Sequence, residues 1–108
     1  MAERGCIVRQ HRLAEKDLAN LSTQDARKAI DEILKLGSEP LSGRPLKGSL
    51  KPARRITSAL SGGWYRAAYL HLPNEAVCIV FMIGPRGGFY EKAASRFRAL
   101  RKQHEIRS

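Results

Sequence analysis

The sequence predicts a single α+β domain, residues 1–108, in which helices pack against an antiparallel sheet. Apolar residues recur at helical spacing in two regions, one near each end of the chain. Between these regions lie three short segments with the composition of strands, separated by turn signals: residues 55–60, 64–72 and 76–83. Hydrophobic residues make up 43% of the chain, which is enough for one modest core.

The N-terminal third predicts a strand followed by two helices. Residues 5–9 contain an apolar run typical of a short strand, and helical spacing begins near Arg12. Ser22, followed three residues later by Asp25, resembles a capping box that opens a second helix, and Gly37 ends that helix. Its expected apolar stripe comprises Ala26, Ala29, Ile30, Ile33 and Leu34. The short link between the two helices predicts a helical hairpin with one shared buried face.

The rest of the chain predicts a loop, a three-stranded meander and a C-terminal helix. Residues 38–53 contain three prolines and two glycines, which exclude a long regular element. Short turns between the three strands make them antiparallel, and the continuously apolar run 76–83 is typical of a central strand covered on both faces. A basic helix is expected over about 89–103, with buried positions at Phe89, Ala93, Phe97 and Leu100.

Positive charge is concentrated in the second part of the chain. The formal net charge is +10, yet residues 1–39 carry as many acidic as basic side chains. Residues 40–74 contain six basic side chains and no acidic one. Charge concentrated in this way attracts a polyanion through counterion release, so a nucleic acid is the expected partner.

Several function classes are excluded by what the sequence lacks. There is no phosphate-binding Walker loop, no dinucleotide-binding glycine motif, no His-Glu-x-x-His and no Gly-x-Ser-x-Gly. Cys6 and Cys78 lie in apolar runs without further ligands at metal-binding spacing, so we expect no metal and no cofactor. No apolar run is long enough for a membrane helix, and the first ten residues do not resemble a secretory signal, so a cytoplasmic location without membrane contact is expected.

The candidate functional residues are arginines at strand ends and one tyrosine. Arg66 lies inside an aromatic strand, where a charged side chain either pairs with a carboxylate or faces a solvent-filled groove. Arg55 lies on the preceding strand, and hairpin pairing brings its face alongside Arg66. Arg86 follows the central strand in a turn, where a guanidinium can bind a phosphate with two hydrogen bonds. Tyr90, four residues later, offers a ring for stacking on an unpaired base.

In their order and spacing, these segments resemble the RelE/ParE superfamily of bacterial toxins. The resemblance spans roughly residues 6–97. It rests on Ala14-Glu15-Lys16-Asp17-Leu18, Pro45-Leu46-Lys47-Gly48, Arg54-Arg55-Ile56, Trp64-Tyr65-Arg66-Ala67-Ala68-Tyr69, Ile83-Gly84, and Arg86 through Tyr90 to Ala93. It implies a compact RelE-like fold and a toxin that a cognate antitoxin protein holds silent.

RelE-type members of the superfamily cleave mRNA in the ribosomal A site without a metal, so the resemblance implies an endoribonuclease whose substrate's 2′-hydroxyl attacks the adjacent phosphate. By motif position, Arg66 and Arg86 would hold the scissile phosphate and Tyr90 would orient the nucleotide. Arg55 would take the first position of a basic-Ile-basic pair. The second position of that pair is Thr57 rather than lysine, which leaves the proton acceptor unassigned, because arginine stays protonated.

Other basic residues complete the predicted site. Lys47 and Lys51 in the loop, or His71 near a strand end, are candidates for the proton acceptor. The residues expected to contact RNA are Lys47, Lys51, Arg54 and Thr57.

Two alternatives stay open at the level of the sequence. A ParE-like member would share the fold and block DNA gyrase without being a nuclease. A basic RNA- or ribosome-binding module without toxicity would need neither activity.

Overall fold

The computed structural model describes residues 5–85 and 87–104, and within them a five-stranded mixed sheet lies between helices. The helices and strands follow one another as β1 (Ile7–Gln10), α1 (Arg12–Ala19), α2 (Thr23–Leu34), β2 (Arg44–Pro45), β3 (Arg54–Leu60), β4 (Gly63–Leu72), β5 (Val77–Pro85) and α3 (Phe89–His104). Single 3-10 turns occur at η1 (Lys35–Gly37), η2 (Gly48–Leu50) and η3 (Pro73–Glu75). The α+β class and the predicted order of elements are confirmed.

The strand order in the sheet is β1-β5-β4-β3-β2. β3, β4 and β5 form the predicted antiparallel meander. Two features go beyond the prediction. β1 pairs in parallel with the first half of β5, which the helical crossover through α1 and α2 makes possible. The short β2, inside the predicted loop, pairs with the start of β3 at the opposite edge.

Strand β5 contains an irregularity at Phe81. Its register with β4 passes from Met82 opposite Ala68 to Val80 opposite Tyr69, so Phe81 is an extra residue without a partner on β4. Such a bulge interrupts the regular alternation of side chains between the two faces of the sheet. Phe81 and Met82 accordingly both belong to the core beneath α3.

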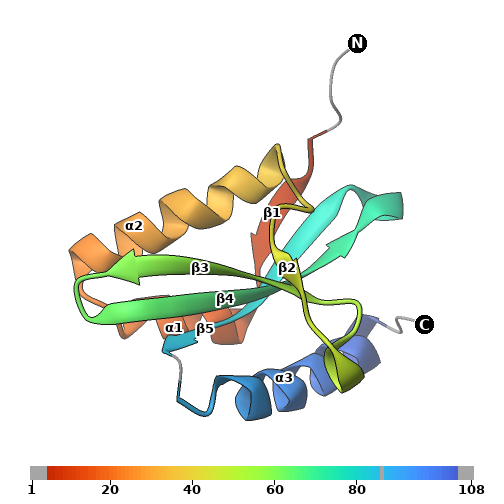
Figure 1. The fold of residues 1–108 in the computed structure, drawn as a ribbon. Helices are drawn as coiled ribbons and strands as arrows, with labels where there is room; N and C mark the ends of the chain where they lie inside the picture. Colours follow the sequence, from red (N-terminus) through yellow and green to blue (C-terminus); the bar gives the residue numbers. More distant parts are fainter. Residues whose placement is uncertain (1–4, 86, 105–108) are drawn as a thin grey trace.

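The sheet separates two hydrophobic cores, and Figure 1 shows α2 and α3 on opposite sides of it. On one face α1, α2 and η1 bury Ala14, Leu18, Ala29, Ile33 and Leu36 against the sheet. On the other face α3 and the segment after β2 bury Phe89, Ala93, Phe97, Leu100, Leu46, Leu50 and Ala53. The predicted buried stripe of α3 is confirmed, and β5 is buried on both faces as expected.

One position of the predicted α2 stripe is wrong. Leu34 is 56% exposed, and Leu36 is buried in its place. Ala29, Ile33 and Leu36 stand at i, i+4 and i+7, the spacing of one helix face, and this face meets the sheet. Leu34 follows Ile33 by one position and is therefore turned about 100° away from the sheet.

The predicted cap of α2 is present, with a difference in the role of Asp25. Ser22 Oγ accepts a hydrogen bond from the Asp25 backbone N–H at 3.1 Å, as in a capping box. The Asp25 carboxylate instead accepts hydrogen bonds from Ser61, at 3.0 Å from the backbone N–H and 2.7 Å from Oγ. These bonds hold the pKa of Asp25 below its ordinary value and tie α2 to the turn between β3 and β4.

The loop before β3 is fastened to the sheet by Tyr69. The buried phenol donates to the Pro40 carbonyl at 2.7 Å and accepts from the Gly43 N–H at 3.0 Å. A Cβ at position 43 would stand 2.7 Å from the Tyr69 ring and from the Arg55 carbonyl, so only glycine allows this approach. The loop thereby has a defined path beneath β3.

A partly buried ion pair joins the two helical layers at the free edge of β5. Asp17 on α1 accepts two hydrogen bonds from the guanidinium of Arg96 on α3 and one, at 2.9 Å, from the Ile83 N–H. Arg96 also donates to the Phe81 carbonyl at 3.2 Å. The pair therefore satisfies backbone groups of β5 at the point where β1 no longer covers them.

Candidate nucleic-acid interface

Arg66 lies on the α3 side of the sheet, in the middle of the β3–β4 hairpin. Strand alternation places it on the face of Ala68 and opposite Thr57 of β3. The residue is half-buried, and within the described part of the chain it forms no ion pair. Its Nε is buried and makes no hydrogen bond there. The structural salt bridge that the sequence left open for Arg66 is thus absent from the described residues.

Tyr90 supplies the contact that Arg66 makes. Its ring lies on the first turn of α3, and the Arg66 guanidinium carbon stands 5.5 Å from the ring centroid, within the range of a cation–π interaction. The Tyr90 ring meets the buried Phe89 edge-on at 5.4 Å and remains 41% exposed. The docked helix α3 therefore presents Tyr90 next to Arg66 with one side open to solvent.

Arg55 completes a cationic group around Tyr90. Its guanidinium donates to Thr57 Oγ1 at 3.0 Å, so the threonine at the second position of the basic pair orients the first. An open hollow of about 330 Å³ is lined by Arg55, Lys47 and Tyr90, with Pro45, Leu46 and Leu50 forming its apolar wall. Within this hollow, two cations from different segments face one aromatic ring.

The remaining predicted residues do not join this group in the described structure. Arg54 alternates to the opposite face, where its guanidinium donates to the carbonyls of Gly43 at 2.8 Å and Leu41 at 3.3 Å. Lys51 is exposed beyond η2 and does not line the hollow. Arg86 lies outside the described residues.

His71 is set apart from Arg66 by both face and distance. It alternates to the helical-hairpin side of β4, while Leu70 and Leu72 on either side of it pack in the α3 core. Five residues of extended strand separate it from Arg66, about 16 Å. Burial, with a smaller contribution from Arg54, lowers the pKa of its imidazole below the ordinary value of 6.5. The lowered pKa favours the neutral imidazole, but His71 is directed away from the hollow.

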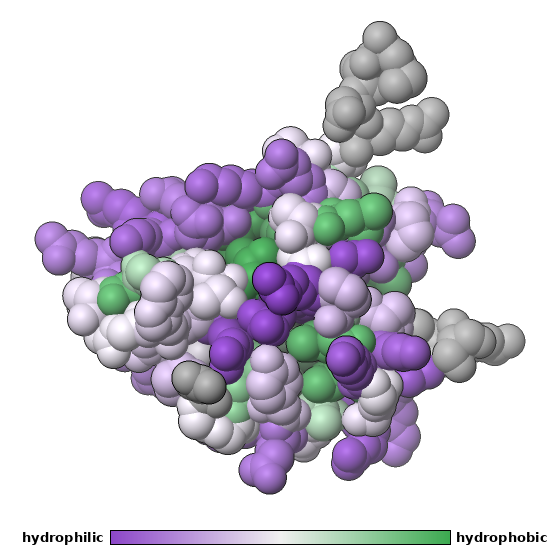
Figure 2. All heavy atoms as spheres, in the orientation of Figure 1, coloured by the Kyte–Doolittle hydropathy of each residue, from purple (hydrophilic) through white to green (hydrophobic). Residues whose placement is uncertain are grey.

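Figure 2 shows strongly hydrophilic side chains gathered across the middle of one face, over β2 and β3 and beside α3. β2 and β3 belong to residues 40–74, which carry no acidic side chain. A cleft edge with a single sign of charge concentrates anions and guides their approach. The arrangement can hold a phosphate beside an aromatic ring.

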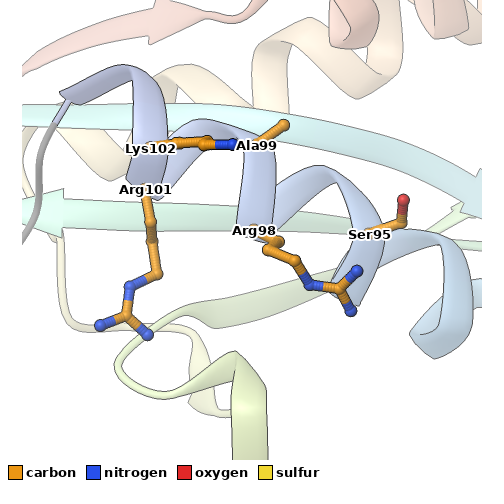
Figure 3. A pocket seen from close by; sticks show the side chains of 5 residues that line it. All are labelled: Ser95, Arg98, Ala99, Arg101 and Lys102. Carbon is orange, nitrogen blue, oxygen red and sulfur yellow. The ribbon is translucent and has the colours of Figure 1, made fainter.

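A second basic surface lies on the outer side of α3, and the sequence reasoning did not single it out. A shallow hollow there is lined by Ser95, Arg98, Ala99, Arg101 and Lys102. Figure 3 shows Arg98 and Arg101 extending from the same side of the helix. The spacing of basic residues at three- and four-residue intervals in the predicted helix was the signal that could have revealed this face.

Two features are absent from the part of the chain that the structure describes. Residues 5–85 and 87–104 contain no group of three His, Cys, Asp or Glu side chains able to hold a metal ion. Among the same residues, no helix has the length and apolar character needed to cross a membrane.

Comparison with solved structures decides the fold. A double-arginine mutant of the E. coli toxin RelE in the free state matches with a TM-score of 0.68 and 16% identity, over 85% of this chain and 93% of that one. The fold is that of the RelE toxins. The RelBE2 toxin–antitoxin complex of Mycobacterium tuberculosis matches with a TM-score of 0.67 and 23% identity, over 76% of this chain and 99% of that one.

An archaeal RelE–RelB complex from Pyrococcus horikoshii matches with a TM-score of 0.59 and 22% identity, covering 77% of this chain and 97% of the other. No family model and no curated protein matches the sequence. The RelE-like fold predicted from the order of short motifs is confirmed by these structural matches, although identity to each of them is below 25%.

Proposed function

We propose that this chain is the toxin of a toxin–antitoxin pair and that it cleaves mRNA on the ribosome in the manner of RelE. The observation that carries the proposal is the group formed by Arg66, Tyr90 and Arg55 on the α3 side of a RelE-like fold. Arg66 lacks a carboxylate partner in the described structure, so its charge is available to an anionic ligand. A purely structural arginine at such a half-buried strand position would be expected to form an ion pair.

In the proposed reaction the 2′-oxygen of a ribose attacks the adjacent phosphorus. The bond between that phosphorus and the 5′-oxygen of the next nucleotide breaks, and the products are a 2′,3′-cyclic phosphate and a 5′-hydroxyl. The 2′-hydroxyl loses its proton and the leaving 5′-oxygen gains one, so the overall charge is unchanged. The protein must orient the RNA and stabilise the additional negative charge of the pentavalent state.

Different residues of the site suit the tasks of stabilising the phosphorane, orienting the RNA and exchanging protons. Arg66 and Arg55 are permanently charged and would stabilise the phosphorane, and the open side of the Tyr90 ring would orient a base. Arg86 is proposed, from its motif position, as a second phosphate ligand beside Arg66. Lys47 is the lysine that shares the hollow with Arg55, and we therefore prefer it to His71 as the group that exchanges protons with the substrate.

A cognate antitoxin is the proposed protein partner. The similar structures include toxin–antitoxin complexes of RelE with RelB. A partner that silences this chain would have to cover the cationic hollow, and an acidic segment with an amphipathic helix has the matching chemistry. The outer basic face of α3, with Arg98 and Arg101, would remain to bind phosphates of ribosomal RNA.

Thr57 favours the alternative of a ParE-like gyrase inhibitor. In the structure Thr57 orients Arg55 but adds no second cation to the strand, so the phosphate site has one charge less than the motif of the nucleases implies. The plain RNA-binding module is the third possibility, and it requires neither toxicity nor a partner.

Regulated expression in bacteria, followed by primer extension on abundant mRNAs, tests the proposal. We expect cuts phased with codons that disappear when translation initiation is blocked. Induction of DNA damage without such cuts would overturn the nuclease in favour of gyrase inhibition. If the chain binds RNA but causes neither mRNA cuts nor DNA damage, only the RNA-binding module remains as an explanation. Arg66→Ala is the matched inactive control, and Leu34→Ala, on the exposed side of α2, is the control for expression.

A further inference from the structure

Trp64 is an exposed aromatic residue that neither hydrophobic core uses. It is the chain's only tryptophan, and its side chain is 66% exposed, the highest value among the large hydrophobic residues described as exposed. It is the second residue of β4, beside the hairpin turn, after Gly63 with its φ of +123°. Opposite it on β3 stands Ala59, which is too small to cover an indole ring. Its neighbour Tyr65, in contrast, turns to the other face and is half-buried against the helices.

Strand alternation places Trp64 on the same face as Arg66. Residues two apart on a strand are about 6.6–6.8 Å from one another. Arg66 in turn contacts Tyr90, because the guanidinium carbon of Arg66 lies 5.5 Å from the centroid of the Tyr90 ring. Along this face, an exposed aromatic ring, a cation and a second exposed aromatic ring therefore follow one another. Trp64 belongs to the outer part of the hairpin, and Tyr90 to the start of α3.

The surroundings of Trp64 favour a nucleic acid over a protein as its ligand. Its neighbours at the hairpin end are Ala59, Ser61, Gly62 and Gly63, which do not form the contiguous apolar surface that protein docking requires. Among the described residues, Arg66 is the charged side chain two positions along the same face, in a stretch of chain without acidic residues. Exposed aromatic rings alternating with cations are the pattern of sites that stack single-stranded bases.

We propose that Trp64 stacks on the base that flanks the phosphate held by Arg66, on the side away from Tyr90. The site would then hold two successive bases, one on each ring, with their shared phosphate at the arginine between them. This inference rests on the proposed function and extends it, because it assigns a second nucleotide position to the substrate site. Stacking on an indole accepts any base, so the position contributes affinity and alignment more than sequence preference.

The single tryptophan makes the proposal directly measurable. Short single-stranded RNA with 2′-O-methyl groups cannot be cleaved and can be titrated against the protein at low salt, where phosphate contacts are strongest. We expect quenching of the tryptophan fluorescence. An oligonucleotide with an abasic residue at the stacked position should lose that quenching, although its phosphates are unchanged.

Substitutions provide the second measurement, by fluorescence anisotropy of a labelled oligonucleotide. Trp64→Ala should weaken binding about 5- to 150-fold, the range of one stacked base, and Trp64→Phe should retain part of the affinity. Leu34→Ala, at another exposed apolar side chain, should leave the affinity unchanged. Because Trp64 is exposed, circular dichroism should show all three variants to be folded.

The outcomes separate this inference from the proposed function. Equal RNA affinity of Trp64→Ala and the unsubstituted chain, or absent quenching, would overturn the stacking proposal even if mRNA is cleaved. Loss of antitoxin binding by Trp64→Ala with unchanged RNA affinity would also overturn it, in favour of a protein contact. Quenching that depends on the base, in a protein that cuts no mRNA, would support the stacking and refute the nuclease.

Discussion

Removal of the charge of Asp17 should destabilise the whole domain, because this carboxylate joins both helical layers to the central strand. Asp17→Asn keeps the size of the side chain and one oxygen for the Ile83 N–H. It removes the negative charge that faces the Arg96 guanidinium, whose side chain is only 20% exposed, against 16% for Asp17. The variant thus leaves a poorly solvated cation without its counter-ion.

The size of the effect follows from the burial of the pair. Removing one partner of a fully buried ion pair costs about 3–5 kcal/mol. Asp17→Asn should cost less than this, about 2 kcal/mol, because both side chains are partly exposed and the new amide can still accept a hydrogen bond. In a domain of this size each kcal/mol lowers Tm by about 4–8 °C, so Tm should fall by about 8–16 °C.

Urea unfolding followed by circular dichroism at neutral pH measures this cost, and a double-mutant cycle with Arg96→Gln isolates the pair. The double variant should be more stable than the sum of the single losses predicts, with a coupling of about 1–2 kcal/mol. Glu32→Gln is the matched control, because Glu32 pairs with Lys35 at 3.0 Å on the exposed surface of the molecule. Such a pair contributes at most about 0.5 kcal/mol. The reasoning is refuted if Asp17→Asn costs no more than Glu32→Gln, or if the cycle shows no coupling.

Three further predictions concern the candidate site, the loss of stability at acid pH and the two cysteines. Arg66→Ala should abolish growth inhibition on induction while changing the free energy of unfolding by less than about 1 kcal/mol, since Arg66 forms no ion pair with the residues that the structure describes. An unfolded variant in circular dichroism would contradict this. The hydrogen bonds from Ser61 depress the pKa of Asp25 in the folded state, so the resulting stability is present above the ordinary value of 3.8 and is lost as the pH falls through the folded pKa. The urea midpoint of Asp25→Asn should therefore fall less steeply between about pH 5 and pH 3 than the midpoint of the unsubstituted chain. If the midpoints of the two proteins fall in parallel, Asp25 does not contribute to the loss of stability at acid pH. Burial raises the pKa of the Cys78 thiol to about 12. In the native protein iodoacetamide should therefore modify the half-buried Cys6 before Cys78, as mass spectrometry of the labelled protein would show. Equal rates of modification at the two cysteines would refute the burial of Cys78.

Local patterns account for the part of the structure that the sequence predicts well. The β3–β4 hairpin follows from its turn residues, and its register then places Thr57 opposite Arg66 without any long-range information. The helical spacing of Phe89 and Phe97 predicts that α3 docks, and this docking brings Tyr90 to Arg66. The candidate site could be anticipated because each of its parts depends on neighbours in the sequence.

Features that depend on distant pairing could not be predicted in this way. The place of β1 beside β5 depends on where the helical crossover returns the chain. Asp17 and Arg96 are separated by 79 residues, and no local pattern relates them. Arg54 is an intermediate case: because neighbouring side chains on a strand point to opposite faces, Arg54 and Arg55 could not both face the hollow, and alternation alone would have shown it.

The uncovered half of β5 has a consequence for solubility. The strand contains a long β-prone apolar segment, and such a segment with free backbone groups at a sheet edge is a template for pairing with other chains. β1 covers the groups up to Val80, and the side chains of Asp17 and Arg96 occupy the Ile83 N–H and the Phe81 carbonyl beyond it. The ion pair is thus also a guard against intermolecular strand addition, and its loss should favour aggregation of molecules that are still folded.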